Sequence, residues 1–280
     1  MIPPTSIDGT DITGATIDGT DVQEITVDGD VVFSAAPAGA FDITQLSLDT
    51  TYSTSNTRPT EIEWKPDGTK AFVSFDNDDI LREYDCSTPF DFGTRSTTRD
   101  INSNDGLPGT IMFADNGQKF YEGGQDADIV TEYNTSSPFS LNNLSQLNTN
   151  GGNTFSDMGM MISDDGNRIY VGGDDPIEEL TLSTNFSLSN VTNKTISGQN
   201  GTHYGLTFND DGSKFYGIIP GSLTVKQYDL NSNYDLDAGF TETASVSFSG
   251  NRGFGITWSP IGDKFWIADG NDDLIREYSI

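Results

Sequence analysis

Residues 61–90 read EIEWKPDGTKAFVSFDNDDILREYDCSTPF, and this stretch decides the fold. A short apolar segment ends at Trp64, and residues 66–68 (Pro-Asp-Gly) follow with the composition of a tight turn. Proline presets φ there, and glycine supplies a positive φ that other residues avoid. Residues 70–75 and 80–84 have the composition of two further strands. The stretch therefore predicts three antiparallel strands in succession and the approach to a fourth.

The same pattern occurs five times along the chain. Successive turn glycines are 49, 49, 46 and 50 residues apart, with an apolar residue four positions before each and a Lys or Arg two positions after it. A period of about 40–50 residues with four strands is typical of a β-propeller blade. We therefore predict an all-β, five-bladed β-propeller; the alternative, a β-sandwich, does not repeat at this period. The turn glycines are Gly68, Gly117, Gly166, Gly212 and Gly262.

The first and last segments of the repeat region together supply the strands of one blade. Residues 41–48 (FDITQLSL) have the composition of the outermost strand of the later repeats, whereas the last repeat stops at Ile280 after its third strand. We expect residues 41–48 to supply the missing strand and close the ring, which removes open sheet edges. The propeller domain then spans residues 41–280.

A shorter repeat precedes the propeller within residues 1–33. Ile-Asp-Gly at 7–9 and 17–19 and Val-Asp-Gly at 27–29 recur every ten residues, and Asp-Gly between β-branched residues is a hairpin signal. This small β-strand segment has few large apolar residues, so we expect it to pair with a partner or with copies of itself in a homo-oligomer; the alternative is a flexible tail. Residues 34–40 (SAAPAGA) have the composition of a linker.

The charge excludes several classes of partner. The chain has 14 Lys and Arg against 43 Asp and Glu, a net charge of −29, which disfavours nucleic acid and anionic membrane surfaces. No apolar run approaches the ~20 residues of a membrane-spanning helix. Concentrated salt screens such self-repulsion, so the composition fits a halophilic or marine source, or simply a soluble acidic protein.

The cysteine content and the N-terminal sequence limit the cellular compartments in which we expect the protein. Cys86 is the only cysteine, so an intrachain disulfide is impossible. The N-terminus lacks the basic and apolar regions of a secretory signal. We expect synthesis in the cytoplasm and, if the protein works outside a cell, release by another route.

Aligning the repeats on their turn glycines predicts a ligand site. We call the face that carries the loops between second and third strands the top face, and the opposite face, with the five tight turns, the turn face. The residues that precede the innermost strands differ from blade to blade at the top mouth of the central channel. Cations beside aromatic residues there are able to hold a polar ligand such as a sugar; the alternative is that they satisfy loop backbones. The predicted site comprises Arg58, Glu61, Asp157, His203, Tyr204, Arg252 and Phe254.

The same residues allow a weaker catalytic hypothesis. Glu61 and Asp157 have the residue types of an acid/base pair in a glycosidase. No Ser/His/Asp order stands out around His203, the sole histidine. We therefore predict that the protein is not an enzyme.

Acidic loops on the top face suggest a calcium site, because Ca²⁺ prefers clustered oxygen ligands. The alternative is ordinary solvated turn carboxylates, and we predict no required cofactor. The candidate ligands are Asp76, Asp78 and Asp79 in one loop and Asp269, Asp272 and Asp273 in another.

Two segments carry a resemblance to known proteins. WKPDGTKAFVSF (64–75), with its counterparts FNDDGSKFYGI (208–218) and WSPIGDKFWIA (258–268), resembles acidic propeller repeats in proteins of marine bacteria, phages and haloarchaeal viruses. ATIDGTDVQEITVDGDVVF (15–33) is similar to N-terminal β segments of structural proteins of haloarchaeal tailed viruses.

The resemblance implies a virion surface protein: a tail fibre, spike or capsid decoration. Residues 1–33 would then dock on other virion proteins, and the propeller would bind a host-surface glycan or protein. The alternatives are a free lectin-like propeller of a bacterium, extracellular or cytoplasmic, and a five-bladed glycosidase.

Overall fold

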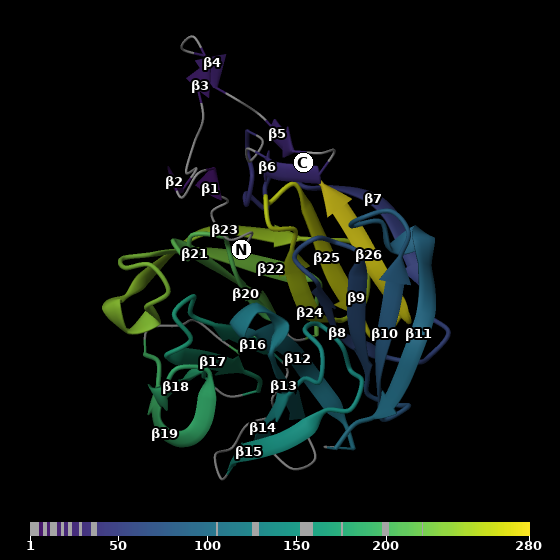
Figure 1. Cartoon of the computed structure of the whole chain (residues 1–280), viewed down its shortest axis with the longest axis vertical. Helices are drawn as coiled ribbons and strands as arrows, with labels where there is room; N and C mark the ends of the chain where they lie inside the picture. Colours follow the sequence, from purple (N-terminus) through teal and green to yellow (C-terminus); the bar gives the residue numbers. More distant parts are fainter. Residues whose placement is uncertain are drawn as a thin grey trace.

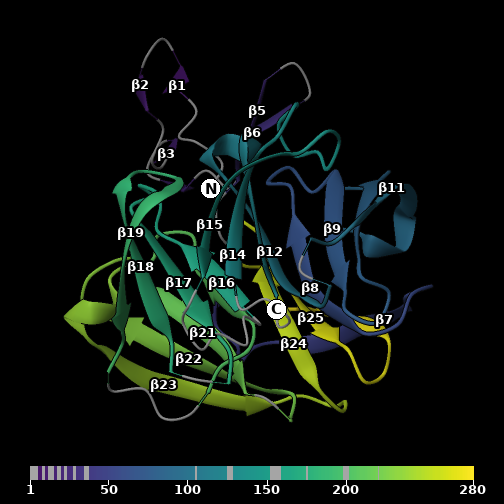
Figure 2. The ribbon, with the colours of Figure 1, turned by 90° about the horizontal axis from the view of Figure 1, so that it is seen from below.

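The computed structural model describes short strands within residues 6–34 and the ranges 38–104, 106–124, 129–151, 159–174, 176–197, 202–219 and 221–280. The propeller prediction is confirmed, because this part of the chain forms five four-stranded antiparallel sheets (Figure 1). In Figure 2 the strands β8, β12, β16 and β24 lie toward the centre, and β11, β19 and β23 lie at the periphery. No helix of the described residues is long and apolar enough to cross a membrane.

Four blades are continuous in sequence, from an innermost to an outermost strand. The first contains β8 (Pro59–Trp64), β9 (Lys70–Phe75), β10 (Ile80–Cys86), η1 (Phe92–Thr94) and β11 (Arg95–Asn102). The second contains β12 (Pro108–Ala114), η2 (Asp115–Gly117), β13 (Lys119–Gly124), β14 (Ile129–Asn134) and β15 (Ser145–Gly151). The third contains β16 (Gly159–Ile162), β17 (Arg168–Gly172), β18 (Glu178–Thr184) and β19 (Ser187–Thr195). The fourth contains β20 (Leu206–Phe208), β21 (Lys214–Ile219), β22 (Thr224–Leu230), η3 (Leu236–Ala238) and β23 (Phe240–Ser247).

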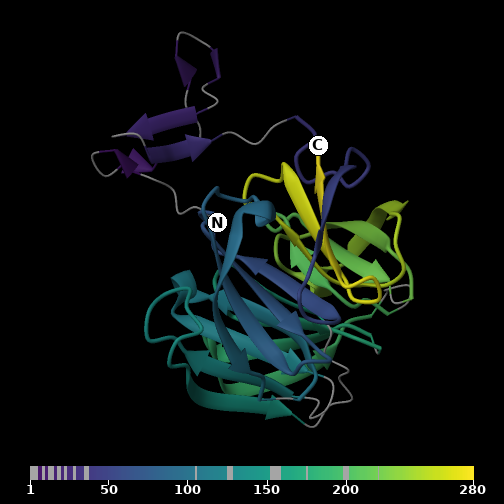
Figure 3. The ribbon, with the colours of Figure 1, turned by 90° about the vertical axis from the view of Figure 1, so that its right-hand side faces the viewer.

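The fifth blade joins the two ends of the domain. It contains β24 (Gly253–Trp258), β25 (Lys264–Asp269) and β26 (Leu274–Ser279), and its outermost strand is β7 (Ser47–Ser53), from the other end of the chain. Figure 3 shows β7 beside the yellow strand β26, and Tyr278 pairs with Leu48. The expected closure is confirmed, but the bounds predicted for the strand, 41–48, were wrong. It begins at Ser47, because Phe41 has a positive φ of 59° and a turn follows it.

Phe41 belongs to a motif that recurs in all five blades. An aromatic residue in the left-handed conformation, with φ between 52° and 59°, covers each turn glycine. Its backbone N–H donates to the carbonyl oxygen of that glycine at 2.7–3.1 Å. A Cβ on Gly117 would lie 2.4 Å from the Phe139 ring, so glycine is required for this close approach as well as for its positive φ. The pairs are Phe41 on Gly262, Phe90 on Gly68, Phe139 on Gly117, Phe186 on Gly166 and Tyr234 on Gly212.

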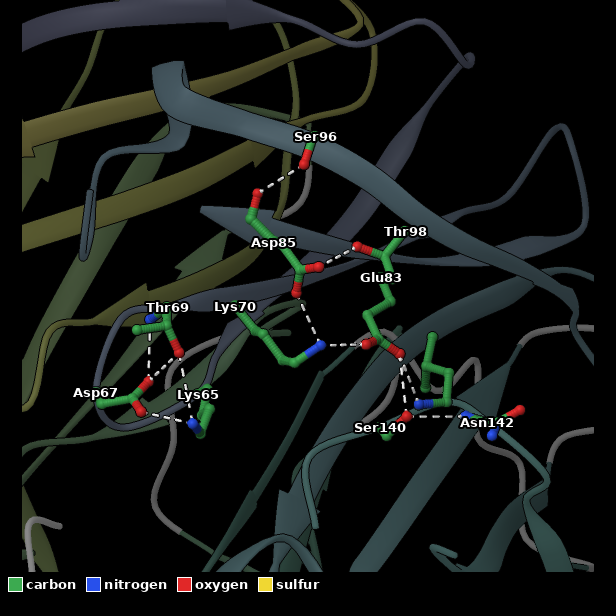
Figure 4. A network of polar contacts seen from close by, with 11 residues as sticks. Lys65, Asp67, Thr69, Lys70, Glu83, Asp85, Ser96, Thr98, Ser140 and Asn142 are labelled. Carbon is green, nitrogen blue, oxygen red and sulfur yellow. Dashed lines mark hydrogen bonds and ion pairs between the residues drawn. The ribbon is translucent and has the colours of Figure 1, made fainter. Parts of the chain in front are cut away.

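The repeated lysine is partly exposed and joins neighbouring strands through ion pairs with buried carboxylates. Lys70 Nζ contacts the carboxylate of Glu83 directly, and it contacts the carboxylate of Asp85 at 2.9 Å (Figure 4). Glu83 is 2% exposed and also accepts from the Leu141 N–H of the next blade at 2.9 Å. A buried carboxylate needs such partners to offset its desolvation. Equivalent ion pairs join Lys119 to Glu132 and Lys264 to Glu277.

Three strand pairs precede the propeller, each antiparallel and two-stranded. The tripeptide turns expected at 7–9, 17–19 and 27–29 fall partly on residues 8–9, 18–19 and 28–29, outside the described residues, as do linker residues 35–37. The domain boundary therefore stays a prediction. The pairs are β1 (Ser6–Ile7) with β2 (Thr10–Asp11), β3 (Thr16–Ile17) with β4 (Thr20–Asp21), and β5 (Glu24–Val27) with β6 (Asp30–Ser34).

Candidate functional site

Four of the predicted site residues form one cluster on the top face. The guanidinium carbons of Arg58 and Arg252 lie 5.0 and 4.8 Å from the centroid of the Phe254 ring. The ring of Tyr204 stacks on Phe254 at 5.7 Å with an interplanar angle of 18°. Guanidinium groups are attracted to aromatic faces within about 6 Å. We call Arg58, Tyr204, Arg252 and Phe254 the arginine–aromatic cluster.

The carboxylates of Asp76 and Asp174 bind two side chains of this cluster. Arg58 Nη1 lies 3.0 Å from Asp76 Oδ2, and the Arg58 side chain is 28% exposed. Arg252 Nη2 donates to the Tyr204 hydroxyl at 3.2 Å, which donates to Asp174 Oδ1 at 2.6 Å. Burial and the hydrogen bond to Asp174 raise the pKa of Tyr204, so this hydroxyl remains a donor at neutral pH. These contacts hold the guanidinium groups of Arg58 and Arg252 in one orientation, while Arg58 remains partly exposed to solvent.

Two features of the backbone position the side chains of the arginine–aromatic cluster. Arg58 has a positive φ of 60°, and non-glycine residues in this region concentrate at functional sites. Its N–H donates to Asp273 Oδ1 at 2.7 Å, and its carbonyl accepts from the Asp76 N–H at 3.2 Å. A Cβ on Gly270 would lie 2.5 Å from the Phe254 ring, so only glycine allows the ring to lie there.

Glu61 lies deeper than the predicted mouth, at the axis where the five innermost strands meet. It is 4% exposed and accepts from the Ile62 N–H at 3.0 Å and the Thr110 hydroxyl at 3.4 Å. Small residues at this level are a packing requirement, since a Cβ on Gly255 would lie 2.2 Å from Glu61 Oε1. Burial raises the pKa of Glu61 well above its ordinary value. We call this level, formed by Glu61, Thr110, Gly159, Gly205 and Gly255, the axial ring.

Of the remaining two predicted site residues, His203 does not join the cluster. His203 was expected at the channel mouth, but it is fully buried, and its Nε2 lies 2.8 Å from the Tyr228 hydroxyl of β22. Its side chain packs where a Cβ on Gly217 would stand, inside the fourth blade. Asp157 lies outside the described residues.

The carboxylates of five of the six candidate calcium ligands have other partners. Asp269 is fully buried and contacts Arg276 Nε at 2.9 Å, while Asp272 contacts Arg276 Nη2 at 2.6 Å. Asp76 pairs with Arg58, Asp78 accepts from the Thr57 N–H at 2.8 Å, and Asp273 accepts from Arg58 as above. Asp79 adopts a positive φ of 52° at a turn, which aspartate tolerates. Within the described ranges no group of three or more His, Cys, Asp or Glu residues is placed to hold a metal ion. Calcium binding stays a prediction.

A cavity on the turn face was not foreseen from the sequence. It has a volume of about 580 Å³ and is lined by residues of all five blades. Five of these stand at the same position of each repeat, five residues before the turn glycine: Glu63, Met112, Met161, Thr207 and Thr257. Burial raises the pKa of Glu63 to about 8. The alternation of side chains along the innermost strands was the signal that could have found it.

No protein-family model matches the chain, and no curated protein is significantly similar to it.

Proposed function

We propose that this chain is a non-enzymatic virion surface protein, a tail fibre, spike or capsid decoration, whose top face binds a host-surface ligand. The observation that supports binding most strongly is the arginine–aromatic cluster. Arg58 and Arg252 lie over one ring, that of Phe254, in a protein with a net charge of −29. The counterpart positions of two other blades hold Leu107 and Thr202, so the cluster is not a requirement of the repeat.

The chemistry of the cluster suits an anionic group. Guanidinium presents several N–H donors in a plane and binds carboxylate or sulfate oxygens in pairs. The Nε–H groups of Arg58 and Arg252 are buried and have no hydrogen-bond partner among the described residues. The Arg58 side chain as a whole is 28% exposed, which leaves it accessible to a ligand. The ligand class that fits is a carboxylated or sulfated host-surface sugar.

Two features favour binding over hydrolysis. Glu61, one member of the suggested acid/base pair, is 4% exposed and engaged in the axial ring. The arginine–aromatic cluster supplies cations and aromatic faces, which orient a ligand without reacting with it.

The N-terminal strand pairs fit an attachment role. Their strands have two to five residues each, and isolated two-stranded hairpins are marginally stable in water. Pairing with other virion proteins, or with copies of this chain, would complete them. The setting on a virion rests on the resemblance of the repeats and of residues 15–33.

A glycan array with the full chain tests the ligand. We expect binding to acidic glycans that falls more than tenfold when Arg58→Gln and Arg252→Gln are combined, because each charge-assisted hydrogen bond contributes about 1.5–3 kcal/mol. Lys194→Gln is the matched control, since Lys194 loses the same charge on the outer strand β19 with a side chain 49% exposed. Equal binding by the double variant and the wild type would contradict the proposal.

A further inference from the structure

The cavity on the turn face is separate from the arginine–aromatic cluster on the top face. Its volume of about 580 Å³ is within the range of small-molecule sites, about 300–1,000 Å³. The axial ring narrows the channel at its inner end, where Cβ atoms on Gly159, Gly205 and Gly255 would lie within 2.0–2.4 Å of the adjacent blade. A ligand would therefore enter from the turn face, past residues such as Pro66 and Pro260.

The cavity lining carries more negative than positive charge. Lys65 is the one Lys or Arg among the described lining residues, and its ammonium already lies 2.5 Å from Asp67 Oδ2. Four lining carboxylates form no ion pair with a Lys or Arg side chain within the described ranges: Glu63, Asp115, Asp164 and Asp210.

The carboxylates at the cavity mouth repel one another. Burial and the nearby carboxylates of Asp211 and Asp164 raise the pKa of Asp210. Like charges in one site disfavour their ionised forms, whereas a cation among them favours those forms. The mouth therefore attracts cations and repels anions.

Two acceptors stand at the same depth on neighbouring innermost strands. Glu63 of β8 and Thr257 of β24 each precede their turn glycine by five residues, and two residues earlier on these strands a Cβ on Gly255 would lie 2.6 Å from Glu61 Cα. Thr257 is 8% exposed and lines the cavity, and its hydroxyl has no hydrogen-bond partner in the part of the chain that the structure describes. Buried polar groups in folded proteins are nearly always hydrogen-bonded, so this hydroxyl indicates a ligand. Glu63 is only partly buried, which leaves its carboxylate open to the cavity.

The same level provides an apolar wall. Met112 and Met161, at the counterpart positions of the second and third blades, line the cavity and are 6% and 4% exposed. Methionine adapts to irregular apolar shapes. Few acceptors beside thioethers suit an organic cation with a carbon chain better than a metal ion such as Ca²⁺, which takes about six to eight oxygen ligands.

A primary alkylammonium ion has the matching chemistry. Its three N–H groups are donors for the Glu63 carboxylate and the Thr257 hydroxyl, and its methylene groups pack on apolar surface as a lysine stem does. We infer that the turn-face cavity binds a primary alkylammonium group, with the nitrogen between Glu63 and Thr257 and the carbon chain against Met112 and Met161. The inference does not depend on the proposed role of the top face.

The test uses the full chain labelled with ¹³C-methyl methionine, in 0.5 M NaCl at pH 9, and titrated with n-butylammonium chloride. The salt screens the diffuse attraction of cations to the net charge of −29. We expect saturable binding at one site per chain, with the largest methyl shifts at Met112 and Met161, and no saturable binding of butan-1-ol or butyrate. The inference is overturned by no saturation up to about 50 mM butylammonium, which covers millimolar dissociation constants, by shifts confined to other methionines, or by equal binding of butan-1-ol or butyrate.

Variants separate the cavity from the overall charge. Glu63→Gln removes a charge-assisted hydrogen bond and should weaken butylammonium binding at least tenfold. Asp49→Asn is the matched control, because it removes one carboxylate from the exposed outer strand β7 and should leave binding unchanged. Thr257→Val removes the hydroxyl at nearly constant size and should weaken binding a few-fold. Unchanged affinity in Glu63→Gln, or an equal loss in Asp49→Asn, would overturn the inference; if Glu63→Gln does not fold, unchanged affinity in Thr257→Val does so.

The pH dependence is a readout that a merely structural Glu63 would not move. Glu63 faces Glu61 on its own strand, Thr257 of β24 and the Phe113 N–H of β12, and burial raises its pKa to about 8. An alkylammonium stays charged to about pH 10. Binding should therefore tighten more than tenfold from pH 6 to pH 9 in the wild type and only slightly in Glu63→Gln. The same pH dependence in both proteins would contradict the assigned role of Glu63.

Primary alkylammonium groups occur on free amines and on lysine side chains. Parallel titrations with n-butylammonium and with Nα-acetyl-lysine N-methylamide distinguish these sources. Tighter binding of the blocked lysine supports a lysine side chain of a partner protein, and tighter binding of butylammonium supports a free amine. The Arg58→Gln/Arg252→Gln variant should bind butylammonium as the wild type does, so this inference and the proposed function fail separately.

Discussion

Glu63 should make the protein less stable as the pH rises. Burial raises its pKa from 4.5 to about 8, so between these values the folded protein keeps a proton that the unfolded chain releases. Stability then falls by about 1.36 kcal/mol per pH unit. The stabilisation is complete below pH 4.5 and is lost by about pH 8. The full shift corresponds to about 5 kcal/mol, and partial solvent contact in the cavity reduces our expectation to about 2–4 kcal/mol between pH 5 and 8.

The variant Glu63→Gln isolates this contribution, because glutamine does not ionise. Urea unfolding at pH 5, 6, 7 and 8 should show the variant close to the wild type at pH 5 and progressively more stable than it toward pH 8. Asp49→Asn is the matched control, since Asp49 is exposed on β7. A difference between Glu63→Gln and the wild type that stays constant over this pH range would refute the reasoning.

Three further predictions concern the axis, the charge and the N-terminus. Gly255→Ala should destabilise the protein by about 2–4 kcal/mol, since its methyl group would lie 2.2 Å from Glu61. Gly221→Ala, with a positive φ of 76° but nothing within 4 Å, should cost only about 1–2 kcal/mol in the same thermal melts; equal losses would contradict the axial packing. Raising NaCl from 0.1 to 1 M should raise the melting temperature, because the Debye length falls from about 10 to about 3 Å; an unchanged temperature would show that the net charge of −29 is not destabilising. Deleting residues 1–33 should leave a propeller that unfolds in one cooperative transition but no longer enters particles; loss of the propeller fold would contradict the two-part organisation.

The repeat could be recognised in the sequence because each residue that recurs in it has one structural role. The turn glycines need a positive φ, and the cations two positions later bind buried carboxylates such as Glu83 and Glu132. The covering aromatic residues escaped notice, because Phe rarely adopts the left-handed conformation. Three of them stand 22 residues after their glycine, and that spacing was the missed signal. Phe41 was consequently assigned to a strand.

The sequence correctly predicted only those site residues that the alignment of the repeats places next to one another. Arg58, Tyr204, Arg252 and Phe254 meet because they lie at, or just before, the starts of the innermost strands of adjacent blades. The alignment does not show which way each side chain points. His203, which precedes β20, lies inside its blade.

The side-chain partners of the acidic loops could not be assigned from the sequence. The acidic loops were interpreted as calcium ligands, yet Asp269 binds Arg276 and Asp76 binds Arg58. Composition shows that carboxylates cluster, but only three-dimensional structure shows which cation each one meets.

The central claim is that this chain is a surface component of a virus particle. Quantitative mass spectrometry of purified particles from its source, followed by cryo-electron microscopy, tests it most directly. We predict a fixed copy number per particle, with residues 1–33 against other virion proteins and the arginine–aromatic cluster facing outward. Absence of the chain from particles that contain the other structural proteins would contradict the claim.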